Sequence, residues 1–332
     1  MDRRQGGFFE NYEPPKFMRP KQGGAKTIVF QIRQTWVAAT AMRRRPDEAK
    51  RAETIARHGL EFLTEHMVDR EHGGVFWGVD AKTKQPRWDG KKHAYGISFA
   101  IYAGAAVEKA LPGEGGKEFA IETFRWLDEH AYDEEHGGYF EHLARDGTPI
   151  RNDRQREAGG KVLPYNTSYD IKTHNTNLHL LEGFTELYGV WPDEQLKARI
   201  EELLGLFLNE MYAEVEGPGG ETVGTFWETF DEDWSVVDKE HISYGHNVEG
   251  AFLILEAAEV IGVLEGEDGE EILRKAKLIV DGSLAAGWDE EAGGLWNKGT
   301  ITQANARRKD WWVQAESLNA LAIMDHYFGN ET

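Results

Sequence analysis

The sequence predicts an all-α protein, an (α/α) toroid in which outer helices surround a ring of inner helices, with short β-hairpins in the loops. Three observations predict this fold. A Gly-Gly phrase recurs along the chain, pairs of helices lie between its copies, and the two helices of a pair differ in how their apolar residues are distributed. Internal repeats of this length define an architecture, because each repeat is one unit that its neighbours cover. We therefore expect a single domain over residues 1–332.

The recurring phrase consists of two glycines followed by apolar or aromatic residues. Four copies are clear, and a degenerate copy lies between residues 220 and 227. The clear copies cover residues 6–9, 69–77, 133–140 and 289–296. They recur about every 65 residues, and the last interval is a little over twice that, as expected for a repeat of two helices. Because glycine adopts positive φ at little cost, each pair predicts a tight turn into a short strand.

Two kinds of helix alternate between these phrases. One kind has a single apolar face and charged residues elsewhere, which is typical of outer helices. The other kind is apolar on more than one face, which is typical of inner helices. The predicted outer helices are 47–67, 117–129, 193–211 and 270–284, and the predicted inner helices are 27–42, 95–111, 173–188, 244–261 and 310–327. Segments 79–92 and 145–169 are rich in glycine and polar residues and are interpreted as long loops or hairpins near a site.

Composition restricts the class of partner. The formal charge of −20 disfavours nucleic acid and anionic membranes and favours a neutral or cationic small ligand. No apolar run is long enough to span a membrane, and the N-terminus has no apolar signal core. The absence of cysteine is compatible with a reducing compartment, so we expect a cytoplasmic protein. Eleven tryptophans fit both a sugar site and a large core, so their number alone decides nothing.

One stretch, residues 241–250, combines a histidine and a carboxylate at helical spacing. His246 and Glu249 are three apart, so they lie on one face of a helix. A carboxylate beside an imidazole orients the ring and favours its charged form, as general acid/base catalysis requires. A surface ion pair is the alternative interpretation.

Other polar residues also lie near the N-terminal ends of the predicted inner helices. They are Arg33, Tyr95, Asn175, His179, Trp311, Trp312 and Glu316. Each alone fits a structural role, such as a core histidine or a packing tryptophan. If the inner helices are parallel, however, all these groups meet at one mouth of the ring. The partial positive charge of the helix N-termini there would stabilise an oxyanion.

Four stretches carry a resemblance to a known family: residues 175–182, 187–193, 242–249 and 310–316. The chain resembles the N-acylglucosamine 2-epimerase superfamily, and within it the cellobiose 2-epimerases, over essentially its whole length. The resemblance implies an (α/α)6 barrel and a cofactor-independent enzyme without a metal. The implied reaction is epimerisation of the reducing-end aldose of a β-1,4-linked disaccharide. It proceeds by proton abstraction at C2 through an enediolate.

The resemblance also implies residue roles. His246 would be one acid/base group, Glu249 its partner, and Arg33 a contact to the sugar oxygens. Asn175, His179 and Tyr95 would line the sugar subsite, and Trp311, Trp312 and Glu316 would form its aromatic wall. Asn177 stands where the family often has histidine.

The chain departs from the family after Glu316. The family's second acid/base histidine follows the Trp-Trp motif in a stretch with no match here, and about nine of twelve helices can be counted. We therefore expect an incomplete toroid, truncated relative to the family, that self-associates across its open side. Two alternatives follow: a mannose isomerase or mannose 2-epimerase, and a non-catalytic sugar-binding member. A glycoside hydrolase is less favoured, because it needs two carboxylates across the scissile bond and only Glu249 and Glu316 are candidates.

Overall fold

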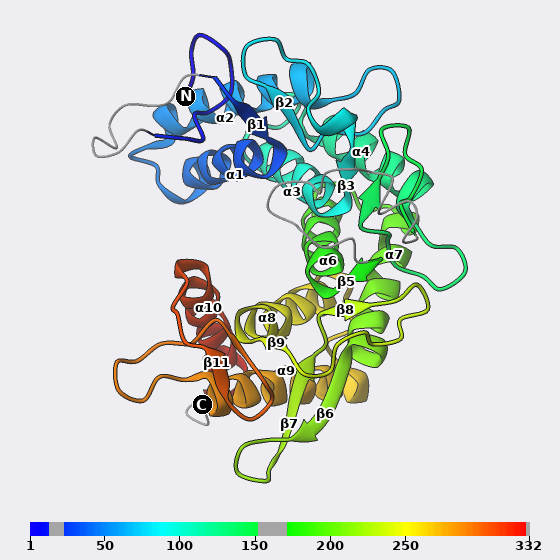
Figure 1. Cartoon of the computed structure of the whole chain (residues 1–332). Coiled ribbons are helices and arrows are strands. Elements are labelled where there is room, and N and C mark those ends of the chain that lie inside the picture. The colour runs from blue at the N-terminus through cyan, green and yellow to red at the C-terminus, as the bar shows by residue number, and fades with distance from the viewer. Residues whose placement is uncertain (13–22, 152–170, 330–332) are drawn as a thin grey trace. The chain divides into compact units, whose positions relative to one another are not determined.

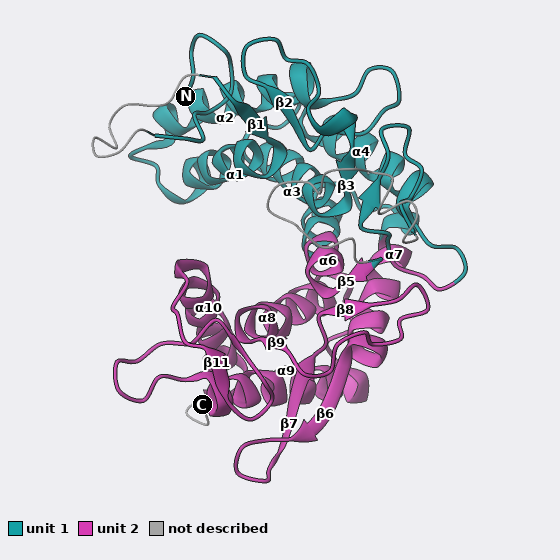
Figure 2. Ribbon diagram, in the orientation of Figure 1, with its two compact units in different colours: residues 1–135, 139–171, 182–196 teal, residues 136–138, 172–181, 197–332 magenta. Residues whose placement is uncertain are grey.

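The structure is a computed structural model that describes residues 1–12, 23–151 and 171–329 (Figure 1). The described residues form nine α-helices joined by short strand pairs, which confirms the all-α prediction. The chain divides into two compact units (Figure 2). Unit 1 holds residues 1–135, 139–171 and 182–196, and unit 2 holds residues 136–138, 172–181 and 197–332. The single domain and the incomplete toroid stay predictions.

Unit 1 is built from α1 (Ile28–Arg44), α2 (Ala49–Phe62), α3 (Ala94–Ala110) and α4 (Gly116–Ala131). Helix α1 packs against α2 and α3, and α3 packs against α4. Helix α3 is buried on most of its surface, whereas α2 and α4 bury one stripe each. This difference confirms the predicted kinds of helix for α3, α2 and α4. Helix α1, which the apolar pattern predicts to be buried on more than one face, instead buries one stripe and exposes Arg33 and Val37.

Unit 2 contains α8 (Tyr244–Ile261), α9 (Gly266–Gly287), α10 (Trp311–Phe328), the first half of α6 (His174–Tyr188) and most of α7 (Glu194–Leu206). Helix α8 is buried nearly all round and packs against α9 and α10 (Figure 1). Helix α10 differs from the prediction of a helix buried on several faces. It buries one stripe, and Trp311 and Leu318 are 76% and 71% exposed.

Short antiparallel strands connect each helix pair to the next. The pairs are β1 (Ala25–Thr27) with β2 (Gly78–Asp80), β3 (Lys92–His93) with β4 (His142–Leu143), β5 (Lys172–Thr173) with β8 (Thr229–Phe230), β6 (Tyr212–Glu216) with β7 (Thr222–Phe226), and β10 (Lys298–Gly299) with both β9 (Ile242–Ser243) and β11 (Ala304–Ala306). The strands β1, β3, β5 and β9 lead directly into α1, α3, α6 and α8. The pairs therefore fix where those helices begin.

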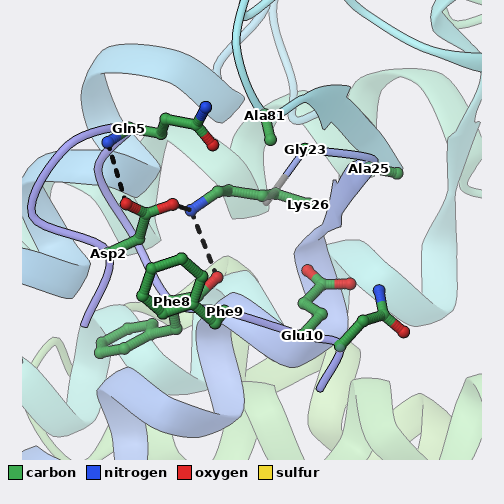
Figure 3. A pocket seen from close by; sticks show the side chains of 10 residues that line it. Asp2, Gln5, Phe8, Phe9, Glu10, Gly23, Ala25, Lys26 and Ala81 are labelled. Carbon is green, nitrogen blue, oxygen red and sulfur yellow. Dashed lines mark hydrogen bonds and ion pairs between the residues drawn. The ribbon is translucent and has the colours of Figure 1, made fainter. Parts of the chain in front are cut away.

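A lysine contacts each clear Gly-Gly phrase and is buried in the first three copies, a feature that the sequence pattern did not predict. In the second copy, both glycines have positive φ and the Asp69 carboxylate accepts a hydrogen bond from the backbone of Glu71. The Lys92 ammonium lies 3.3 Å from the Asp69 carboxylate. Figure 3 shows the first copy, in which Lys26 lies 3.0 Å from Asp2. Lysines fill the same place in the remaining clear copies, namely Lys172 and Lys309.

Two further expectations concern loops and membranes. Segment 79–92 contains the end of β2, a 3₁₀ turn at Trp88–Gly90 and the start of β3, so it is partly ordered into strands. Most of segment 145–169 lies outside the described residues. Among the helices that the structure describes, none has the length and apolarity that a membrane crossing requires.

Candidate functional site

The candidate site in unit 2 is organised around the first turn of α8. Ser243, the last residue of β9, has an extended backbone and forms the N-cap of this helix. Its hydroxyl accepts a hydrogen bond from the backbone N–H of His246 at 3.3 Å, which satisfies one of the free donors of the first turn. His246 is therefore held on the third residue of a buried helix, and Glu249 follows one turn later.

The imidazole of His246 is paired with a carboxylate from another element. Nδ1 of His246 lies 2.8 Å from Oε2 of Glu228, in the segment between β7 and β8. The two side chains are 17% and 20% exposed, so the pair is largely desolvated but still accessible. The backbone carbonyl of Glu228 accepts a hydrogen bond from the first N–H of α6, that of His174, at 3.0 Å. This bond fixes Glu228 relative to the start of a second helix.

The pairing determines which ring nitrogen of His246 is basic. Burial opposes ionisation of Glu228, but attraction to His246 and their hydrogen bond outweigh it and hold the pKa of the Glu228 carboxyl well below its usual range. An ionised carboxylate can only accept a hydrogen bond. Nδ1 of His246 therefore carries a hydrogen, and in the neutral ring Nε2 holds the lone pair. An imidazole in this state can take a proton from a substrate through Nε2.

A second histidine lies against the same carboxylate. His174 is fully buried, and its ring centroid is 6.0 Å from that of His246. Burial lowers the pKa of His174 to about 3, so this ring is neutral at physiological pH. Within the described part of the chain, neither ring nitrogen of His174 nor Oε1 of Glu228 has a hydrogen-bond partner. The cluster is thus one ionised carboxylate between two imidazoles.

Donor atoms of His174, Glu228 and His246 lie within 4.8 Å of one another. Two histidines and a glutamate form a donor set that zinc accepts. The hydrogen bond from His246 to Glu228 already employs two of these groups, and a metal would have to replace the hydrogen on Nδ1. The expectation of an enzyme without metal or cofactor stays a prediction.

An indole ring lies beside the imidazole of His246. Trp312, the second residue of α10, has its ring 5.2 Å from that of His246, at an interplanar angle of 33°. Helix α8 presents a glycine, Gly245, to the same indole, and a Cβ at this position would lie 2.5 Å from a ring atom. The absence of a side chain at Gly245 is what lets the indole approach the helix. Trp311 lies in the same turn but is largely exposed.

Two more predicted residues meet across α6 and α8. Nε2 of His179 lies 3.8 Å from Oε1 of Glu249, and both side chains are nearly buried. The side-chain amide of Asn177 donates to the backbone carbonyl of Thr173 at 2.9 Å, so Asn177 supports the first turn of α6. Asn175 on α6 and Glu316 on α10 are half-buried.

The remaining predicted residues belong to unit 1. The Arg33 guanidinium lies 4.6 Å from the centre of the Phe99 ring, and the same ring makes an edge contact with Tyr95 at 5.0 Å. Arg33 is exposed and Tyr95 is half-buried. Phe99, which the sequence pattern did not single out, therefore links the two predicted residues of this unit.

The structure pairs the predicted residues differently from the sequence spacing. The spacing predicts Glu249 as the partner of His246, but the contacts described above join His246 to Glu228 and Glu249 to His179. Glu228 was missed, although the repeat contains a signal for it. The third residue after the second glycine of each clear phrase is equivalent to Glu228, which follows the degenerate copy. These equivalent residues are Glu10, Trp77, Glu141 and Asn297.

Comparison with known proteins identifies the family of the chain. A family model described as N-acylglucosamine 2-epimerase (GlcNAc 2-epimerase) matches residues 7–332. The chain belongs to this family. A cellobiose 2-epimerase of Bacteroides fragilis is 28% identical over 332 residues, which are 99% of this chain and 78% of that protein. A D-mannose isomerase of Thermobifida fusca is 24% identical over 329 residues, 94% of this chain and 71% of that protein.

A solved structure gives the same result for the fold. The cellobiose 2-epimerase of Spirochaeta thermophila is 27% identical, with a TM-score of 0.80 over 98% of this chain and 75% of that one. The predicted resemblance is therefore confirmed, as is the class of carbohydrate epimerases and isomerases at the level of the family. The matches span 64% to 78% of the lengths of the curated relatives.

Proposed function

We propose that the protein is a cofactor-independent sugar 2-epimerase that acts on the reducing-end aldose of a β-1,4-linked disaccharide. The observation that carries this proposal is the His246–Glu228 pair, which leaves Nε2 of His246 basic beside the indole of Trp312. An aromatic face beside a base suits an aldose, whose C–H bonds pack on such rings. The names of the relatives support the same substrate class.

The proposed chemistry begins with the open-chain aldose. Nε2 of His246 takes the proton from C2, and the negative charge that develops passes to the carbonyl oxygen of an enediolate. Helix N-termini favour such charge, and α8 begins two residues before His246. Solvent water then delivers a proton to the opposite face of C2, and His246 releases the proton that it took to solvent, which completes epimerisation. Arg33 and Tyr95 are proposed to contact sugar oxygens, and Asn175, His179, Glu249, Trp311 and Glu316 to line the sugar subsite.

The proposal is tested by incubating the protein with cellobiose in deuterium oxide without added metal or cofactor. We expect the glucosyl-mannose epimer to form with deuterium at C2, measured by NMR. A His246→Gln variant should lose both signals while keeping its fold. Absence of both the epimer and the deuterium in the unaltered protein would contradict the proposal for this disaccharide.

A second candidate is an isomerase that interconverts mannose and fructose. A single base is enough for isomerisation, because one group can carry the proton from C2 to C1 on one face of the enediolate. The basic Nε2 of His246 and the likeness to a D-mannose isomerase favour this candidate. Fructose formed from mannose selects the isomerase, and glucose formed from mannose selects a 2-epimerase of monosaccharides. Sugar binding by calorimetry without any turnover would favour a non-catalytic member.

A further inference from the structure

Glu228 occupies a place in the repeat that fixes its carboxylate against the first turns of two helices. Its carbonyl accepts from the first N–H of α6, and the strand that follows it, β8, pairs with β5, which leads into α6. The backbone of Glu228 is therefore bound on both sides by hydrogen bonds. Its carboxylate then reaches Nδ1 of His246 on α8 at 2.8 Å. The backbone from which the carboxylate extends is thus fixed, and the hydrogen bond between Glu228 and His246 orients the ring.

We propose that Glu228 is a positioning residue for the reaction: it holds His246 in the tautomer with hydrogen on Nδ1 and stabilises the imidazolium formed when Nε2 takes the substrate proton. This inference rests on the proposed function, in which His246 is the acid/base group. Glu228 takes no proton in the step. The C2 proton passes to Nε2, the electron pair of the C–H bond remains on the substrate, and the carboxylate stays ionised throughout.

The neighbours of Glu228 direct its charge to His246. His174, on the other side, is fully buried and neutral, so it does not compete as a cation for the carboxylate. Oε1 of Glu228 has no hydrogen-bond partner within the described residues, so Oε2 carries the one described bond to a side chain, which goes to Nδ1 of His246. Lys298 also attracts the carboxylate, but more weakly than His246, which is hydrogen-bonded to it. A desolvated carboxylate interacts with such a partner more strongly than it would in water.

The other contacts of His246 complete its positioning. The backbone N–H of His246 is bound by the Ser243 hydroxyl, and one side of its ring faces the indole of Trp312. These contacts fix the backbone of His246 and one neighbour of its ring. The imidazole can still rotate, and its hydrogen can still exchange between Nδ1 and Nε2. The Glu228 contact restricts both. Loss of this contact should therefore lower the rate more than it weakens substrate binding.

Glu228→Gln tests the charge of the Glu228 side chain without changing its size. The amide keeps the size of the side chain but removes the charge and offers either a donor or an acceptor to Nδ1. We expect kcat to fall by about 10- to 100-fold with little change in KM, because orientation and basicity act in the chemical step. The pH profile of kcat should change as well, because the charge that faces the imidazole is removed. Glu228→Asp should recover part of the rate.

Glu141→Gln is the matched control. Glu141 occupies the equivalent place in the preceding repeat, where its carbonyl accepts from the first N–H of α3 and its carboxylate lies 3.5 Å from Nε2 of His93. This variant should lower the stability and leave the pH profile of the folded protein unchanged. If both variants move the profile equally, or neither does, Glu228 does not act through His246.

A measurement on the free protein distinguishes failure of this inference from failure of the proposed function. In protein labelled with ¹⁵N-histidine, His246, assigned by comparison with His246→Gln, should show the pattern of a single tautomer with hydrogen on Nδ1. Glu228→Gln should change that pattern to a mixture. An unchanged pattern in Glu228→Gln overturns the inference whatever the activity. A changed pattern in a protein that turns over no aldose retains the positioning role and rejects the proposed function.

Discussion

Two histidine–carboxylate pairs have glutamates at equivalent places in the repeats and differ in exposure. The histidines stand at different places, because His93 is the N-cap of α3 and His246 is the third residue of α8. In unit 1, Glu141 lies against His93, and in unit 2, Glu228 lies against His246. Each glutamate follows a Gly-Gly phrase or its degenerate copy, and each gives its carbonyl to the first N–H of a buried helix. The side chains of the first pair are 0% and 1% exposed, whereas about a fifth of each side chain of the second pair is accessible. The same position for a glutamate thus forms one buried pair and one accessible pair.

The two histidines also carry their hydrogens on different nitrogens. Nδ1 of His93 accepts a hydrogen bond from the backbone N–H of Tyr95 at 3.2 Å, so the hydrogen is on Nε2, which faces Glu141. Burial lowers the pKa of His93 well below its ordinary value, so the ring stays neutral. Both nitrogens of His93 are directed at protein groups. A histidine beside a carboxylate is therefore a candidate base only where one of its ring nitrogens has no protein partner and can bind a substrate.

The two pairs should differ most in the effect of replacing their histidines, His246 and His93, by glutamine. Glutamine can donate to the neighbouring carboxylate but cannot act as a base. His246→Gln should reduce C2 hydrogen exchange by about 10³-fold with a small change in stability. His93→Gln should cost about 1–3 kcal/mol of unfolding free energy, because it disturbs a buried hydrogen-bonded group, and leave exchange per folded molecule intact. Exchange is followed by NMR and stability by urea denaturation. Equal loss of exchange in both variants would remove the functional distinction between the clusters.

The acid stability of the protein should depend on the buried histidines of both clusters. The pKa of His174 is about 3 in the folded protein, and its ordinary value is 6.5. Because the unfolded chain takes up the proton first, the stability is full above pH 6.5 and falls as the pH drops from 6.5 towards 3. For each such histidine, the free energy of unfolding falls by about 1.4 kcal/mol per pH unit. At pH 4.5 the loss from His174 is about 2–3 kcal/mol. His93 contributes in the same direction.

Replacing His174 by leucine tests this pH dependence. The stability of His174→Leu should fall less between pH 7 and pH 4.5 than that of the unaltered protein, as measured by urea denaturation at both values. His241, whose side chain is largely exposed, provides the control: His241→Gln should leave the difference between the two pH values unchanged. A His174→Leu variant with the original acid sensitivity would show that this histidine is not the titrating group.

A smaller effect is expected from the glycines that press against an indole in each unit. A Cβ on Gly245 would lie 2.5 Å from the Trp312 ring, and a Cβ on Gly96 would lie 3.1 Å from the Trp77 ring. Gly245→Ala should displace the indole from His246 and lower kcat about tenfold, with a stability loss of about 1–3 kcal/mol. Gly96→Ala should cost stability only. Steady-state kinetics on both variants decides between these outcomes, and an unchanged kcat in Gly245→Ala would mean that the indole does not set the geometry of His246.

The sequence pattern predicted helices more reliably than partners. The prediction of residues 244–261 coincides with α8, because apolar spacing and the serine before the helix are local signals. The pattern also selected His246 and Trp312, which the fold brings together. It missed Glu228, since the contact to His246 spans 18 positions and depends on how β8 pairs with β5. Spacing within one helix cannot report a contact that a strand pair creates. Aligning the phrase copies beyond their aromatic residues would have marked this position.

The smallest effects are expected from replacing the tryptophans beside the two histidines by phenylalanine. Trp77 lies 5.1 Å from His93 and Trp312 lies 5.2 Å from His246, both at an interplanar angle of 33°. Trp77 is buried, and its ring N–H has no hydrogen-bond partner within the described residues, whereas Trp312 is half-buried. Trp77→Phe removes apolar volume but also an unsatisfied donor, so it should cost only about 1–2 kcal/mol of stability.

Trp312→Phe keeps an aromatic face beside His246 but shortens it. Because the sugar would pack on this face, KM should rise about threefold, while the pH profile stays that of the unaltered protein because Glu228 still holds Nδ1. The measurement is the dependence of initial rate on sugar concentration at several pH values. A shifted pH profile in Trp312→Phe would mean that the indole, and not the carboxylate alone, sets the protonation of His246. The two neighbours of the ring therefore have separable signatures: the indole acts on KM, and the carboxylate acts on kcat and its pH dependence.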